Sequence, residues 1–286
     1  MGKIAIITCS TSGLDYVEGY ENIFSARTTI VIDDKEYIDG VDIEPKTFYD
    51  NLESYDQVPS TAQPSPGQLL DIYTEIKNKG YDEAIYISIS DQLSGTYQGV
   101  CLSTSYIDDF TVHPFNSQSA SYITGYMAME AYRLAEEGVD AATILLHLEK
   151  IRDNDHIFFM VDDLKYLVKN GRLSNSAAFM ANILKIKPLL EMTEEGKITA
   201  TEKIRTSKKA IKRIVERFLE ETDNGENARF TFLFNTQAPH YVDIIKKQLE
   251  AAGFDTTRLI SSPISPAVGC HIGKGVVGIG YVKSFD

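Results

Sequence analysis

The stretch PGQLLDIYTEIKNKGYDEAIYISIS, residues 66–90, decides the fold class. Its first half places Leu69, Leu70, Tyr73 and Ile76 on one face of a helix, and the glycine that follows ends that helix. Its second half contains residues 83–88, whose continuous apolar run is typical of a strand buried on both faces. A helix that leads directly into such a strand forms part of a β-α-β unit, so the stretch predicts an α/β fold with parallel strands.

The same alternation continues on both sides of this stretch. Further strands are expected at residues 4–8, 110–115, 156–161, 230–234, 257–261 and 276–282, with a hairpin formed by 186–192 and 197–204. Further helices are expected at residues 45–52, 94–105, 119–137, 141–153, 164–168, 176–184, 207–222 and 241–252. One series ends and another begins near Asn154. The sequence therefore predicts two α/β domains with mostly parallel sheets, residues 1–153 and 154–286.

Composition and charge exclude several classes of protein. The chain has 286 residues and a net charge of −13, which argues against a nucleic acid or an anionic membrane surface as partner. Cys9, Cys101 and Cys270 are far apart and form no CxxC pair, so we expect reduced thiols and no metal site. No stretch approaches the roughly 18 apolar residues of a membrane helix, and the first apolar run is too short for a signal peptide. These features favour a cytoplasmic protein.

Three segments collect hydroxyls, glycines and one histidine where loops meet regular elements. They are residues 60–68, 88–97 and 271–275. In the first segment, Thr61 precedes Ser65, which is placed to cap a helix entered at a proline. The first turn of a helix has free amides and a positive dipole end, which suit an anion. An ordinary capped loop is the alternative for this segment taken alone.

The second and third segments offer similar groups. Ser94-Gly95-Thr96 follows a strand of the predicted parallel sheet, and ligands bind at the carboxyl ends of such strands. Gly95 would let a ligand approach the backbone closely. His271 is the one histidine of five that lies in a glycine-dense loop, although a single histidine is more often structural. Together the three segments predict a clamp for a small anionic group.

No motif completes a reaction on that anion. The GxSxG elbow, the GxxxxGKS phosphate loop and the GxGxxG fingerprint that opens a helix are absent, and no base is adjacent to Ser94. We therefore expect a binding protein with no catalytic residue and no cofactor. A hydrolase or acyltransferase that uses Ser94 as nucleophile is the alternative.

Taken together and in this order, the segments resemble the DegV family of bacterial fatty-acid-binding proteins. Three further stretches also match the family: LKYLVKNGRLS at residues 164–174, IKPLL at 186–190 and RTSKKA at 205–210. The resemblance runs from the first strand to the last. It implies two α/β domains with one acyl chain buried between them. It also implies that the protein presents a long-chain fatty acid such as palmitate or oleate to a separate ATP-dependent subunit of a fatty acid kinase.

The family's functional residues carry over by motif. The resemblance implies that Thr61, Ser94, the Gly95 amide and His271 bind the fatty-acid carboxylate. It implies that Arg172 and Arg205 serve docking of the kinase subunit, and Arg205 lies in a basic cluster. The family's transfer of phosphate to the acid would require ATP and metal from that partner.

Three positions depart from the family pattern. Cys9 stands where the family usually has an acidic residue, Ala62 where it often has serine, and Lys274 where it usually has proline. The apolar stretch 177–184 is expected to line a channel for the tail, with an ordinary helix core as the alternative. A carrier of another apolar carboxylate or of a phosphate is the remaining alternative for the function.

Overall fold

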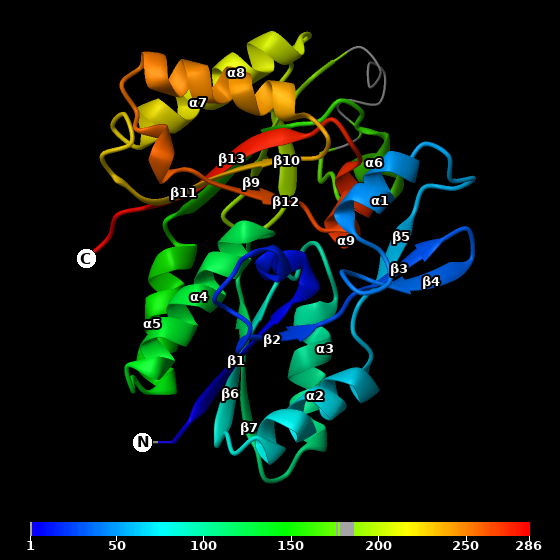
Figure 1. Cartoon of the computed structure of the whole chain (residues 1–286), viewed down its shortest axis with the longest axis vertical. Coiled ribbons are helices and arrows are strands. Elements are labelled where there is room, and N and C mark those ends of the chain that lie inside the picture. Colours follow the sequence, from blue (N-terminus) through cyan, green and yellow to red (C-terminus); the bar gives the residue numbers. More distant parts are fainter. Residues whose placement is uncertain (1, 176, 178–185) are drawn as a thin grey trace.

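The computed structural model describes residues 2–175, 177 and 186–286. Two large β-sheets lie one above the other along the long axis of the molecule, with helices outside each sheet and between them (Figure 1). A small third sheet lies at one side of this stack. The predicted α/β class is confirmed.

The first large sheet is entirely parallel, in the order β2-β1-β6-β7. Its strands are β1 (Ile4–Cys9), β2 (Phe24–Ala26), β6 (Glu83–Ser88) and β7 (Thr111–Asn116). Alternate residues of β1 pack on opposite sides: Ile4 and Ile6 join one apolar cluster, whereas Ala5 and Ile7 join another. Both faces of the sheet are therefore buried, as the continuous apolar runs predict.

Two pairs of helices cover these faces. On one side lie α2 (Pro66–Asn78) and α3 (Thr96–Ser103), and on the other lie α4 (Tyr122–Glu136) and α5 (Ala141–Arg152). Helix α2 begins with the predicted cap, because the Ser65 hydroxyl accepts from the Gln68 amide at 3.3 Å. The Gln68 side chain in turn accepts from the Ser65 amide at 2.8 Å, which completes a capping box.

The second large sheet has six strands in the order β10-β9-β8-β13-β11-β12. Its strands are β8 (Asp155–Met160), β9 (Leu189–Met192), β10 (Ile198–Glu202), β11 (Ala228–Asn235), β12 (Ile260–Pro263) and β13 (Val277–Lys283). Helices α7 (Ser207–Glu221) and α8 (Pro239–Ala251) cover its outer face.

The prediction of mostly parallel strands is wrong for this sheet. Only β11 and β12 pair in parallel. The last strand, β13, runs between β8 and β11 and is antiparallel to both, and β9 and β10 form the predicted antiparallel hairpin. Apolar runs report that a strand is buried, but they carry no information about which neighbour it pairs with or in which direction.

Helix α4 lies between the two large sheets and packs on both. Ile123 and Met127 belong to the same apolar cluster as Ile4 and Ile6 of the first sheet. From the same helix, the Tyr126 ring stacks on Phe230 of the second sheet, with ring centroids 4.1 Å apart and planes at 12°. The two halves of the chain therefore share one core. The predicted domain boundary at residues 153 and 154 falls between α5 and β8 and stays a prediction.

A small antiparallel sheet, in the order β4-β3-β5, was not among the predicted elements. It consists of β3 (Thr29–Ile32), β4 (Lys35–Ile38) and β5 (Ser60–Ala62), and it packs with α1 (Pro45–Asn51), α6 (Lys165–Lys169) and α9 (Pro266–Ile272). Strands of three or four residues leave too little periodicity to be recognised in the sequence. Short 3-10 turns span Ser10–Ser12, Leu14–Tyr16, Thr104–Tyr106 and Thr256–Arg258.

Two further predictions concern the second half of the chain. The predicted loop around His271 is wrong, because His271 lies in the last turn of α9. The helix expected at 176–184 and the tail channel expected at 177–184 fall, apart from residue 177, outside the described residues.

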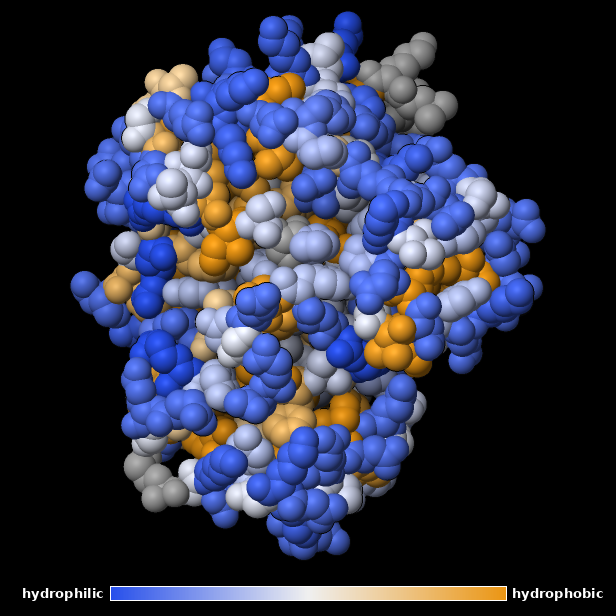
Figure 2. Space-filling model, viewed as in Figure 1, coloured by the Kyte–Doolittle hydropathy of each residue, from blue (hydrophilic) through white to orange (hydrophobic). Residues whose placement is uncertain are grey.

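Hydrophilic residues cover most of the face shown in Figure 2, and hydrophobic residues gather mainly in recesses between the elements. Among the helices that the structure describes, none combines the length and the apolar composition that crossing a membrane requires.

Two glycines of β13 make room for aromatic rings of β11. Gly278 pairs with Phe234 and Gly280 with Phe232 across the antiparallel ladder. A Cβ added at Gly278 would lie 2.5 Å from the backbone oxygen of Phe158 on the other neighbouring strand, which cannot move without disturbing the sheet. These two glycines therefore serve packing at the centre of the sheet.

Gly278→Ala should destabilise the protein by about 1–3 kcal/mol, because it overpacks a filled core. The measurement is the free energy of unfolding from urea denaturation. Gly67→Ala is the matched control: the nearest atom to its added Cβ would be 3.9 Å away and the residue is helical, so stability should stay the same or rise slightly. Equal effects of the two substitutions would contradict the packing role of Gly278.

Candidate functional site

A cavity of about 150 Å³ lies where loops at the carboxyl end of the parallel sheet meet the small sheet and α9. Its polar lining comprises Thr11, Thr28, Thr61, Gln63, Ser94, Thr96, Arg172 and His271, together with Gly95. Its apolar lining comprises Ile89, Leu93, Ala120, Ile198, Ala267, Val268 and Ile272. The cavity thus brings all four residues of the predicted carboxylate clamp together, in an amphipathic pocket of the kind that holds small molecules.

Thr61 and His271 form the centre of the polar wall. The Thr61 hydroxyl and His271 Nε2 lie 2.8 Å apart, which joins β5 to the end of α9. A hydroxyl and a neutral imidazole have two exchangeable protons between them, and their mutual hydrogen bond uses one. If Nε2 carries the ring proton and donates it to Thr61, the Thr61 hydroxyl keeps a proton for an acceptor in the cavity; in the other tautomer the spare proton is on the buried Nδ1.

The histidine is neutral at pH 7. Burial, together with the positive charge of Arg172, lowers the pKa of His271 to about 4. His271 Nδ1 is buried and has no hydrogen-bond partner among the described residues. A neutral histidine can take part in binding an anion only through its hydrogen bonds, so its tautomer matters more than its charge.

Ser94 and Gly95 lie at the start of α3. The Ser94 hydroxyl lies 2.8 Å from the Thr96 hydroxyl and accepts from the Thr96 amide at 3.3 Å. Gly95 is the N-cap of α3, and a Cβ added there would clash with the Gln63 side chain. The first amides of a helix have no partner within it, so this turn can donate to an anion. A side chain at position 95 would therefore have to displace the flexible end of the Gln63 side chain.

Arg172 lies in the cavity wall, although the sequence predicts it at a docking surface. Its Nε donates to the Leu93 carbonyl at 3.0 Å, and its Nη1 donates to the Asn170 carbonyl. Within the described part of the chain, no carboxylate forms an ion pair with Arg172. Its positive charge is therefore available to an anion in the cavity.

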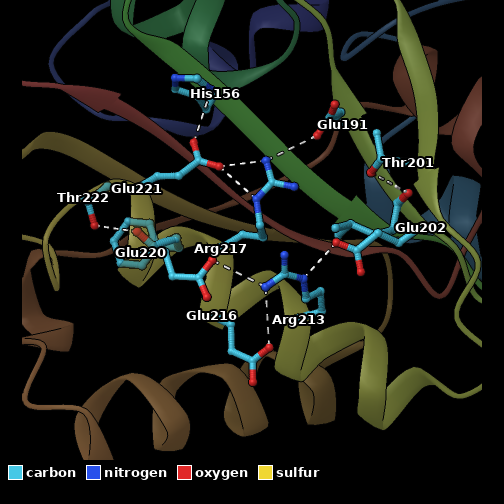
Figure 3. A network of polar contacts seen from close by, with 12 residues as sticks. His156, Glu191, Thr201, Glu202, Arg213, Glu216, Arg217, Glu220, Glu221 and Thr222 are labelled. Carbon is cyan, nitrogen blue, oxygen red and sulfur yellow. Dashed lines mark hydrogen bonds and ion pairs between the residues drawn. The ribbon is translucent and has the colours of Figure 1, made fainter.

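Arg205 lies outside the cavity and is exposed, just before α7. It belongs to the predicted basic cluster, part of which is neutralised within the molecule. Figure 3 shows Arg213 between Glu202 and Glu216, with Arg213 Nε 2.8 Å from the Glu202 carboxylate. Lys212 likewise pairs with Glu216 at 3.2 Å.

The three departures from the family pattern have different surroundings. Lys274 pairs with Glu53 at 2.8 Å and does not line the cavity. Ala62 is exposed in β5. Cys9 is fully buried at the end of β1, and burial raises the pKa of its thiol. Ala62 stands between Thr61 and Gln63, which both line the cavity, and the Cys9 side chain interacts with Thr11, which also lines it.

Sequence reasoning missed several residues of the site. Thr11 follows β1 in the same way that Ser94 follows β6, so the rule that led to Ser94 could also have identified Thr11. Asp39 lies behind the cavity: it is fully buried, and its Oδ1 accepts from the Ala267 amide in the first turn of α9 at 3.2 Å. Burial raises the pKa of Asp39 to about 6. No local pattern connects Asp39 with a helix that begins more than 200 residues later.

The arrangement does not assemble a nucleophile of the serine-hydrolase kind. His271 Nε2 contacts Thr61, and Ser94 contacts Thr96. A catalytic histidine needs an orienting acceptor at its other nitrogen, and His271 Nδ1 has none within the described residues. The alternative that uses Ser94 as nucleophile therefore lacks its base.

Fold and cavity together define a class of two-sheet α/β proteins with an amphipathic pocket at the carboxyl end of a parallel sheet. The chain belongs to the DegV family: the model of this family, described as an uncharacterised protein, matches residues 3–284. Protein DegV of Bacillus subtilis is 31% identical over 279 residues, which cover 97% of this chain and 98% of that protein. The resemblance inferred from the sequence is thereby confirmed.

Solved structures agree in fold over the whole chain. A fatty acid binding DegV family protein from Streptococcus agalactiae has a TM-score of 0.89 and 29% identity, and the match covers 100% of both chains. DegV, a fatty acid binding protein from Bacillus subtilis, has a TM-score of 0.86 and 29% identity, and the match covers 99% of this chain and 100% of that one.

His271→Asn tests the neutral histidine. The pKa of His271 in the folded chain, about 4, lies below its ordinary 6.5, so the unfolded chain binds a proton first as the pH falls. Stability contributed by His271 is therefore complete above about pH 6.5 and is lost as the pH falls toward 4. We expect the difference in unfolding free energy between wild type and H271N to shrink over this range in urea denaturation. A difference that stays constant across these pH values would contradict a depressed pKa.

Proposed function

We propose that this protein binds a long-chain fatty acid and presents its carboxylate to a separate kinase subunit, which forms the acyl phosphate. The observation that carries the proposal is the convergence of Thr61, Ser94, His271 and Arg172 on one amphipathic cavity. These residues come from four distant segments of the chain. The sequence predicts Thr61, Ser94 and His271 as carboxylate ligands, whereas it predicts Arg172 as a docking residue.

The polar end of the cavity suits a carboxylate. Neutral donors are available from Ser94, from the Gly95 turn and from the Thr61–His271 pair, and Arg172 supplies a positive charge. A buried carboxylate needs its acceptor oxygens satisfied and its charge balanced, and hydrogen bonds to an ionised group are stronger than neutral ones. A phosphate offers similar oxygens, so the same donors would also suit the acyl phosphate product.

The apolar end of the cavity suits the start of an alkyl tail. Ile89, Leu93, Ile198 and Ile272 line it, and the last three belong to, or pack against, the core shared by both sheets. Burial of the tail contributes roughly 0.8 kcal/mol per methylene. A cavity of about 150 Å³ holds a head group and the first carbons, so a long tail requires these side chains to move apart.

Relatives support the same reading. The solved structures from Streptococcus agalactiae and Bacillus subtilis are described as fatty acid binding, at 29% identity over nearly the whole chain. We propose that this chain has the binding role without an ATP site of its own, and that the kinase subunit docks near the exposed Arg205. Its three free cysteines fit a reducing compartment such as the cytoplasm.

Native mass spectrometry of the purified protein, followed by organic extraction, tests the proposal. We expect one co-purifying acid of fatty-acid mass, or uptake of added palmitate or oleate. A different apolar carboxylate or a phosphate in the extract would replace the fatty acid as ligand. A protein that carries nothing and takes up neither acid would refute the proposal.

Arg172→Gln and Arg205→Gln separate the head-group site from the docking surface. Arg172→Gln should weaken binding of palmitate by about 1.5–3 kcal/mol, because it removes a charged donor from the cavity. Arg205→Gln should leave palmitate binding unchanged and slow phosphorylation by the kinase subunit. Binding would be measured by isothermal titration calorimetry and phosphorylation with the purified subunit.

If Arg172→Gln leaves palmitate affinity unchanged, Arg172 does not neutralise the head group. If Arg205→Gln weakens palmitate binding, Arg205 belongs to the ligand site or to the structure of the protein, and the docking role is wrong.

A further inference from the structure

Buried polar atoms without a partner gather around the cavity. Among the described residues, six buried side-chain atoms have no hydrogen-bond partner: Thr11 Oγ1, Asp39 Oδ2 and His271 Nδ1 lie at or beside the cavity, and the others belong to Tyr16, Tyr86 and Arg152. Thr11 and His271 line the cavity, and Asp39 contacts the first turn of α9 beside it. Native proteins leave few such atoms, so a group of them at one pocket calls for an explanation.

Of these three residues, Thr11 and His271 line the cavity. The proposed function already uses His271, so Thr11 is the cavity residue that has no role yet. It is the middle residue of the Ser10–Ser12 turn, which follows β1, and only 8% of its surface is exposed. The turn places it at the carboxyl end of the parallel sheet, like Ser94. Both residues therefore lie at the edge where such sheets bind ligands.

The turn does not need the Thr11 hydroxyl for its own structure. Ser10 Oγ accepts from the Thr28 amide at 3.2 Å, and Ser12 Oγ accepts from the Leu14 amide at 3.4 Å. The flanking hydroxyls therefore hold the turn in place. The hydroxyl of Thr11 makes no such contact within the described residues.

The chemical neighbour of Thr11 is the Cys9 side chain. Burial raises the pKa of the Cys9 thiol, while the Thr11 hydroxyl acts in the opposite direction. The thiol is consequently neutral at pH 7, and a neutral thiol is only a weak hydrogen-bond acceptor. The Thr11 proton remains available for a stronger acceptor.

We propose that Thr11 is a further head-group ligand, whose hydroxyl donates to the carboxylate held by Ser94, Gly95 and the Thr61–His271 pair. This inference rests on the proposed function and adds a specific residue to it. An ionised carboxylate has about four acceptor positions on its two oxygens. Thr11 supplies one further donor, beside the Ser94 hydroxyl, the Gly95 amide, Arg172 and the remaining proton of Thr61 and His271. The cost of burying an unpaired hydroxyl is then recovered when the acid binds.

Thr11→Val is the test, because valine keeps the shape of threonine and removes the hydroxyl. We expect about ten- to hundredfold weaker binding of palmitate by calorimetry, as for loss of a hydrogen bond to a charged group. The melting temperature of the ligand-free variant should stay the same or rise, because the substitution removes an unpaired buried polar atom. Thr11→Ser keeps a hydroxyl and should restore most of the affinity.

Thr8→Val is the matched control. Thr8 lies three residues earlier in β1, is equally buried, and its hydroxyl donates to the Ile87 carbonyl at 3.1 Å. Its substitution should lower the melting temperature and leave palmitate affinity unchanged. Thr61→Val serves as the positive control for lost head-group binding.

Two results would overturn the inference. In the first, Thr11→Val binds palmitate like wild type while Thr61→Val binds weakly, and the clamp exists without Thr11. Alternatively, Thr11→Val lowers the melting temperature as Thr8→Val does and Thr11→Ser fails to restore affinity, in which case Thr11 is structural. If wild type itself binds no acid, the proposed function fails, and the inference fails with it.

Discussion

The structure depends on one helix that is buried on both sides. Helix α4 packs against the parallel sheet through Ile123 and Met127 and against the second sheet through the stacked pair Tyr126 and Phe230. The apolar surface that it removes from water therefore belongs to both halves of the chain. Gly125 of the same helix lets the turn after β1 approach closely, since an added Cβ would lie 2.7 Å from the Ser12 carbonyl. The core thereby fixes the position of the turn that carries Thr11.

The small sheet and α9 form one side of the cavity and are held together by specific contacts. The hydrogen bond between Thr61 and His271 joins residues 210 positions apart, and the small sheet and α9 pack in one apolar cluster through β3 and Ala267. Asp39 fastens the first turn of α9 from the same side of the molecule. Because these contacts hold α9 at both ends, His271 is presented to the cavity by a rigid element, and its hydrogen bonds are oriented before a ligand arrives.

The cavity wall carries a positive charge, although the chain as a whole is strongly negative. The net charge is −13, yet the ionisable side chains in the cavity wall are a neutral histidine and an arginine without a carboxylate partner among the described residues. Elsewhere basic side chains form ion pairs with carboxylates, as in the network around Arg213 and Arg217 (Figure 3). A positive charge kept unpaired beside hydroxyl donors is what an anionic head group requires.

The sequence by itself determined the α/β class, most helices and strands and the Ser65 cap, and it predicted the clamp residues Thr61, Ser94, Gly95 and His271, which line one cavity. These follow from apolar periodicity, caps and motifs, which are properties of short stretches of chain. Only the tertiary structure decided the antiparallel course of β13, the small sheet, the helical setting of His271 and the inclusion of Thr11 and Arg172 in the cavity. Strand pairing and cavity walls depend on contacts between residues that are far apart in the sequence. The free energies of these contacts cannot be read from a local sequence pattern.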